Sequence, residues 1–116
     1  MKRERRRDAR IDIDWVAVVR DTTGSSVAEL EDISASGAFI RCEKPLRPKE
    51  QFKLQVVVPN RHPLSANAEV AWLHVCCDDK DLPPCGMGIR FTRIARADRE
   101  FIHDLITKNL WNTCQP

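Results

Sequence analysis

Short segments of alternating apolar and polar residues, separated by turn signals, constrain the fold of this chain more than any other feature. The first segment runs from Ile11 to Val19, and its odd-numbered residues form one apolar face. Strand-like segments follow at about residues 27–33, 38–42, 52–58, 66–75 and 86–91. Turn residues stand between them, as at 22–25, 45–48 and 60–63. Many short strands joined by turns predict an antiparallel sheet closed into a barrel.

The C-terminal part of the chain has a different period. From about Ala97 to Trp111 the large apolar residues recur at helical spacing, namely Phe101, Ile102, Leu105, Ile106 and Leu110. One amphipathic helix is therefore expected to pack on the barrel. A chain of 116 residues has room for one domain, which we expect to span residues 11–116.

The positive charge is concentrated at the N-terminus. Residues 1–10 contain six basic and two acidic side chains, whereas the rest of the chain contains 13 basic and 15 acidic ones. We expect residues 1–10 to be a flexible basic segment, suited to a compact anionic ligand, a nucleic acid or an acidic membrane. No apolar run approaches the roughly 18 residues that span a bilayer, and no apolar signal segment follows the first residues. We therefore expect a cytoplasmic protein without a membrane span.

Neither a metal site nor a catalytic site is expected. A zinc site formed by His74, Cys76, Cys77 and Cys85 is conceivable, but adjacent cysteines on an extended segment point to opposite faces. The five cysteines are better interpreted as small thiols. The sequence has no phosphate-binding glycine loop and no recognisable acid–base pair, so we expect a protein that is not an enzyme and has no cofactor.

Two short motifs carry residues suited to a guanine nucleotide. Residues 5–10, Arg-Arg-Arg-Asp-Ala-Arg, lie directly before the first strand, and an arginine binds phosphate or the O6/N7 edge of guanine through two hydrogen bonds. In residues 32–37, Asp-Ile-Ser-Ala-Ser-Gly, Asp32 can accept from the N1 and N2 donors of guanine and Ser34 can donate. Gly37 supplies an unusual backbone angle or room for a close approach. Alone, these motifs also fit a solvated basic tail and a strand-ending turn.

Together the motifs resemble the PilZ domain family. That family has R-x-x-x-R before its first strand, matched by residues 6–10, and [D/N]-x-S-x-x-G after its second strand, matched by residues 32–37. It also tends to have a tryptophan that ends a long strand, matched by residues 69–72. A Gly-x-Gly-hydrophobic-x-Phe strand, matched by residues 86–91, and a C-terminal helix follow. The matches occur in the order of the family and extend from about Arg5 to Leu110.

The resemblance implies a six-stranded antiparallel β-barrel with a C-terminal helix that binds cyclic di-GMP on its outer surface. The implied ligand-binding residues are Arg5, Arg6, Arg10, Asp32, Ser34 and Gly37, with Arg7, Ala35, Ser36, Trp72 and Gly88 as further candidates. Trp72 is expected in the core, although it lies near the implied site. Family members with an arginine in the position of Arg5 tend to bind a pair of ligands, so two molecules per domain are expected.

Two alternatives remain beside a ligand-binding receptor. The first is a PilZ adaptor that acts only through protein–protein contacts, and the second is a basic-tailed nucleic-acid binder. Beyond residue 10 the chain is net acidic, and it has only seven aromatic residues without an RNA-binding aromatic strand, so no nucleic acid is expected as a partner. A receptor of this size needs an effector protein in trans, in bacterial control of motility, biofilm formation or polysaccharide production.

Overall fold

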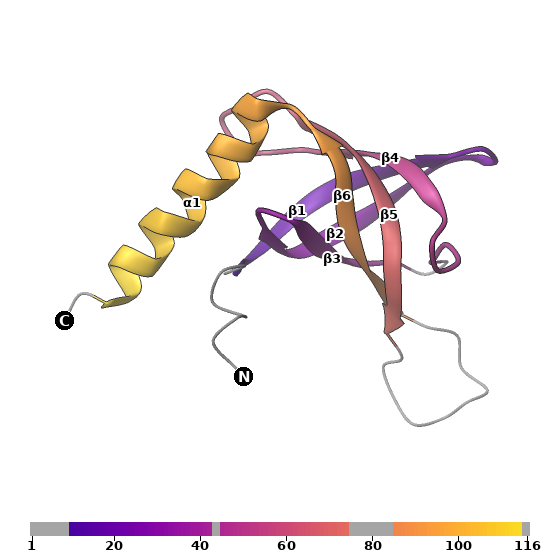
Figure 1. Cartoon of the computed structure of the whole chain (residues 1–116), viewed down its shortest axis with the longest axis horizontal. Helices are drawn as coiled ribbons and strands as arrows, with labels where there is room; N and C mark the ends of the chain where they lie inside the picture. Colours follow the sequence, from indigo (N-terminus) through magenta and orange to yellow (C-terminus); the bar gives the residue numbers. More distant parts are fainter. Residues whose placement is uncertain (1–9, 43–44, 75–84, 115–116) are drawn as a thin grey trace.

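The structure, a computed structural model, describes residues 10–42, 45–74 and 85–114. Six strands precede one helix: β1 (Arg10–Asp21), β2 (Gly24–Ser34), β3 (Gly37–Arg41), β4 (Gln51–Val56), β5 (Leu64–His74), β6 (Gly86–Ile94) and α1 (Arg96–Cys114). The strands close in the order β1-β2-β3-β6-β5-β4, and every neighbouring pair is antiparallel. The predicted six-stranded barrel with a C-terminal helix is confirmed (Figure 1).

The strands follow the predicted alternation because one face of each strand fills the barrel. Leu30, Leu54 and Val70 are fully or almost fully buried, whereas the residues between the core positions face solvent. The β1–β2 hairpin ends in the predicted turn. There Thr23 and Gly24 donate backbone N–H groups to the Asp21 carboxylate at 2.8 and 3.1 Å, and the bonds from Thr23 lower the pKa of Asp21.

Helix α1 packs across one side of the barrel, far from the tip of the β1–β2 hairpin (Figure 1). Ile102 is completely buried, as its place in the helical period predicts. The first turn of the helix is fixed by Asp98, which accepts from Arg61 at 2.9 Å and from the Ser65 N–H at 3.4 Å. The guanidinium of Arg61 also lies 4.1 Å from the centre of the Phe101 ring. The side chain of Leu110 lies outside the described residues.

The cysteines are not all free thiols. Cys42 is free and half-buried, and burial raises the pKa of its thiol. Cys85 is disulfide-bonded, so the expectation of a free thiol was wrong there. The antiparallel pairing of β5 with β6 brings Cys85 against the end of β5, where its N–H donates to the His74 carbonyl at 2.9 Å. The spacing of the cysteines in the sequence does not show that Cys85 lies next to the end of β5. Within the described ranges, no helix combines the length and the apolar character needed to cross a membrane.

Candidate functional site

The turn between β2 and β3 is organised by the hydroxyl of Ser34. Ser34 is completely buried, and its Oγ accepts the N–H of Gly37 at 3.1 Å and the N–H of Ser36 at 3.3 Å. The same hydroxyl lies 3.2 Å from the Gly37 carbonyl, to which it donates. The turn is also tied to β6, because the Phe91 N–H donates to the Ser36 carbonyl at 2.8 Å. The serine of the predicted motif therefore holds the shape of its own loop.

Gly37 allows β3 to approach β6 closely. Its φ angle is not positive, so of the two roles predicted for this glycine the unusual backbone angle is wrong. A Cβ atom at this position would collide with the Ile89 carbonyl and lie 3.3 Å from the Arg90 Cα. These obstacles are backbone atoms of the paired strand, and they cannot rotate away. The close approach therefore explains the glycine.

A β-bulge presents Asp32 on the outer surface. Strict alternation would place Asp32 on the same face as Leu30, inside the barrel. The register between β2 and β3 shifts between these two residues, so Ile33 points inward and Asp32 points outward. There Asp32 accepts a hydrogen bond from Arg10 Nη1 at 3.0 Å, and the two side chains are 20% and 46% exposed. The last arginine of one predicted motif thus contacts the aspartate of the other.

Several neighbours of Asp32 shift the pKa of its carboxyl in opposite directions, and the net shift is upward. Burial raises its pKa, whereas the Arg10 charge and a hydrogen bond from the Phe39 N–H oppose that rise. The nearby carboxylates of Asp12 and Glu31 raise the pKa further. Since the pKa is higher in the folded state, protonation of Asp32 favours folding as the pH falls, and this contribution is lost as the pH rises. Additional hydrogen-bond donors at Asp32 would stabilise its charged form.

Beside Asp32 lies an aromatic cluster formed by Phe39, Trp72 and His74 on the outside of the barrel. The rings of Phe39 and Trp72 are stacked with centroids 5.5 Å apart and an interplanar angle of 24°. The His74 ring meets both of them edge-on. A Cβ at Gly88 would overlap the indole of Trp72, so Gly88 lets this ring lie flat on β6.

Trp72 is 48% exposed, so its expected place in the core was wrong. Ala68 and Val70 point inward from β5, and alternation would continue that face through Trp72. The β5–β6 register instead shifts between Val70 and Trp72, and the indole turns outward. The residue types of β5 give no sign of this bulge, so the alternation predicted the wrong side of the sheet for Trp72.

Cross-strand pairing joins these groups into one row on the outer face. Asp32 is paired with Phe39, Phe39 with Gly88, and Gly88 with Trp72, across β2, β3, β6 and β5. On the other side, Asp12 of β1 is paired with Asp32. The Arg10–Asp32 ion pair and an exposed aromatic surface therefore lie side by side. Sequence reasoning missed Phe39 and His74, because their contribution depends on strand register.

Acidic side chains adjoin the row. A hollow of about 500 Å³ between β1 and β2 is lined by Asp12, Asp14, Glu29, Glu31 and Asp32, and by Arg41, which forms an ion pair with Glu31. Such a surface repels phosphate groups. A phosphate-bearing ligand at the row therefore needs cations to offset this field, and among the predicted site residues the arginines are the cations.

Most, but not all, of the predicted site residues lie in the described part of the chain. Arg10, Asp32 and the turn of residues 34–37, which includes Ala35 and Ser36, form one end of the row, and Trp72 and Gly88 form the other. Arg5, Arg6 and Arg7 lie outside the described residues.

Comparison with known proteins gives a consistent assignment. The profile of the PilZ domain family matches residues 4–108 of this chain. No curated protein sequence matches it. Several solved structures match, and the inhibitor of motility MotI/DgrA from Bacillus subtilis is among them, with 15% identity over 93% of this chain and a TM-score of 0.76.

Two further structures were solved with cyclic di-GMP. The PilZ domain of YcgR from Escherichia coli has 16% identity, covers 90% of both chains and gives a TM-score of 0.70. The MrkH–cyclic di-GMP complex from K. pneumonia has 16% identity over 92% of this chain, with a TM-score of 0.75. At these identities the likeness shows the fold. The present chain spans 52% of MotI/DgrA and 51% of a further MrkH structure, about half the length of each.

Proposed function

The chain belongs to the PilZ domain family, and from that premise we propose that it binds cyclic di-GMP on the outer surface of its barrel. PilZ domains are typically binding modules without catalytic activity. The YcgR PilZ domain and MrkH were each solved with cyclic di-GMP. Support from this chain comes from the arrangement of its own residues.

The observation that carries the proposal is the contact of Arg10 with Asp32 at one end of an exposed aromatic row. Asp32 accepts from the N1 and N2 donors of a guanine. Arg10 then leaves Asp32 and binds a phosphate or the O6/N7 edge of guanine, because the ligand offers both side chains groups of matching geometry. The exposed face of Trp72 offers a surface on which a base stacks. Ser34 and Gly37 keep the turn in the shape that presents Asp32.

The basic N-terminal segment completes the site in this proposal. Arg5 and Arg6, with Arg7 beside them, supply the positive charge that the acidic hollow makes necessary. Two cyclic di-GMP molecules bring four phosphate charges together, and several guanidinium groups offset their repulsion. We therefore propose a pair of stacked ligands, with Arg5 as the additional cation.

Signalling follows from a change in the N-terminal segment. The basic segment that precedes β1 folds over the barrel when the ligand is bound, and an effector protein in trans distinguishes the two states. We place this receptor in the cytoplasm, in control of motility, biofilm formation or polysaccharide production. The competing function is an adaptor that uses the same fold without the nucleotide.

Replacement of Asp32 by alanine should reduce selectivity for guanine. The wild type should bind cyclic di-GMP more tightly than cyclic di-AMP by well over about tenfold, because adenine lacks the N1–H and N2 donor pair that a carboxylate accepts. In Asp32→Ala this ratio should fall towards one, as measured by calorimetry with both nucleotides. Asp12→Ala is the matched control, since it removes the neighbouring carboxylate of the same row and should keep the ratio. An unchanged ratio in Asp32→Ala would place base recognition elsewhere.

A further inference from the structure

A second row of side chains crosses the barrel at a different place. Arg20 on β1 is paired with Lys53 on β4, Lys53 with Asn67 on β5, and Asn67 with Arg93 on β6. All four side chains are exposed, because the residues beside them fill the core. We call Arg20, Lys53 and Arg93 the basic row. None of the three belongs to the residues assigned to the nucleotide.

The surface along the basic row is hollowed. One hollow of about 380 Å³ is lined by all three cations together with Gln55, Ser65 and Asn67, among others. A second hollow of about 390 Å³ shares Arg20, Lys53 and Asn67 with the first and extends to the β1–β2 turn. The two hollows are therefore continuous along one side of the barrel and can accommodate an extended or helical segment.

Among the residues that the structure describes, no carboxylate pairs with the cations of the basic row. Within residues 10–42, 45–74 and 85–114, neither an ion pair nor a side-chain hydrogen bond involves Arg20, Lys53 or Arg93. Of the other described arginines, Arg10, Arg41, Arg61, Arg90 and Arg96 each pair with a carboxylate, whereas Arg47 and Arg99 do not. The nearby Asp21 is engaged by its own turn. The basic row is therefore a local positive surface on a chain that is net acidic beyond residue 10.

Exposed valines adjoin the basic row. Val18 lines the first hollow and is paired with Val27 on β2, which is 73% exposed. Val16 and Val57 are about half exposed and are joined by a backbone hydrogen bond of 2.8 Å. Along β1, Val18 is two residues from Arg20, so the apolar and cationic surfaces are about 7 Å apart. Apolar surface beside unpaired charge is typical of an interaction surface.

We propose that the basic row and these valines bind an acidic, partly apolar segment of a partner protein. The carboxylates of the segment pair with Arg20, Lys53 and Arg93, and its apolar side chains cover Val18 and Val27. A single small anion does not fit, since neighbouring strands are about 4.8 Å apart and the row spans roughly 14 Å. A single-stranded nucleic acid uses stacked aromatic side chains, and the residues that line the first hollow include none.

This proposal goes beyond nucleotide binding and does not depend on it. Asn67 and Trp72 are five residues apart on β5, and Arg93 and Gly88 are five apart on β6, so the two surfaces are separated by about 17 Å along the strands. The nucleotide row also extends over β2 and β3, whereas the basic row extends over β1 and β4. A partner segment can therefore bind while the nucleotide site is occupied.

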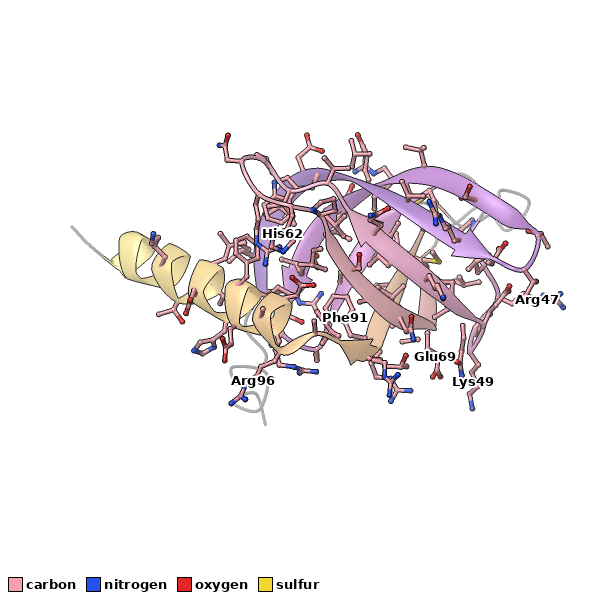
Figure 2. The ribbon with its side chains drawn as sticks, turned by 90° about the horizontal axis from the view of Figure 1, so that it is seen from above. Arg47, Lys49, His62, Glu69, Phe91 and Arg96 are labelled. Carbon is pink, nitrogen blue, oxygen red and sulfur yellow. The ribbon has the colours of Figure 1, made fainter. Side chains whose placement is uncertain are left out.

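The test compares two triple variants that remove the same number of charges. Arg20→Gln, Lys53→Gln and Arg93→Gln together remove the basic row. Arg47→Gln, Arg99→Gln and Lys108→Gln together remove three exposed cations elsewhere, and Figure 2 shows Arg47 at the end of the barrel far from α1. The probe is a short fluorescein-labelled peptide of glutamate and leucine, measured by fluorescence anisotropy. A single-stranded oligonucleotide and inorganic phosphate serve as competitors.

The wild type and the control variant should bind the peptide with similar affinity, and the basic-row variant should bind it about tenfold more weakly or worse. Val27→Ser should weaken binding of this peptide but not of polyglutamate. Equal losses in both triple variants, or no binding by the wild type, would overturn the proposal. So would an oligonucleotide that displaces the peptide at lower concentration than unlabelled peptide does. The basic-row variant should keep its cyclic di-GMP affinity, so failure of nucleotide binding in the wild type is a separate result.

Discussion

Replacement of Arg10 by alanine should raise the Kd for cyclic di-GMP by about ten- to a hundredfold. The guanidinium of Arg10 lies at the edge of the row, 3.0 Å from Asp32, and is 46% exposed, so it is available to the ligand. Hydrogen bonds to charged groups contribute about 1.5–3 kcal/mol each, and 1.4 kcal/mol corresponds to a factor of ten. Arg6→Ala should produce a loss of the same size if the two arginines act together. Calorimetric titration measures both.

Arg20→Ala is the matched control, because Arg20 is also an exposed arginine of β1 and lies outside the nucleotide row. It should keep the wild-type Kd. The loss of affinity in Arg10→Ala should grow as the pH falls. The Arg10 charge lowers the pKa of Asp32, so removal of Arg10 raises that pKa. A protonated Asp32 accepts fewer hydrogen bonds from guanine. If Arg10→Ala instead abolished cooperative unfolding, the arginine would be structural and the assignment wrong.

The second large effect is a difference in stability between alanine substitutions at two glycines of the site, Gly37 and Gly88. Gly37→Ala should destabilise the fold by about 1–3 kcal/mol, because the new methyl group meets the backbone of β6 at Ile89 and forces the strands apart. The expected fall in Tm is on the order of 5–15 °C. At Gly88 the three atoms nearest to a new methyl group all belong to the side chain of Trp72, which is half exposed and, unlike a paired backbone, can move outward. Gly88→Ala should keep a Tm close to that of the wild type.

The two variants should also differ in nucleotide binding. Gly88→Ala displaces the Trp72 ring from β6, so it should lose several-fold in cyclic di-GMP affinity without unfolding. Trp72→Ala is the control, and it should lose a similar amount if base stacking on the indole contributes about 1–3 kcal/mol. Thermal unfolding and titration of all three variants provide the comparison. A stable Gly37→Ala, or a Gly88→Ala with wild-type affinity, would contradict this account of the row.

The sequence predicted the barrel because its strands have one buried face, and burial of that face imposes the alternation of residue types. The ends of the strands differ by few residues from the prediction. The turn at Asn60 is an example of a signal with a clear cause, since its φ of 62° is in the left-handed region that asparagine tolerates. The motif at residues 32–37 was found for the same reason, since its polar and glycine residues interrupt a strand.

The arrangement of the site was not predictable from residue types. Two register shifts, after Leu30 in β2 and after Val70 in β5, place Asp32 and Trp72 outside although alternation places both inside. A bulge depends on how two strands pair, which is a property of the tertiary structure. The family resemblance supplied the role of Asp32, but it did not show that Phe39 lies between Asp32 and Trp72. The basic row likewise appears only when β1, β4, β5 and β6 are paired.

The central claim is that this domain is a cyclic di-GMP receptor, and calorimetric titration of the wild-type chain tests it most directly. The count of ligands per chain comes from the same titration, and a value of two would support the stacked pair. The account predicts heat of binding with a Kd in the micromolar range or tighter, which corresponds to about −8 kcal/mol or more. No heat, together with no change in Tm at about a millimolar cyclic di-GMP, would contradict it and would support the adaptor.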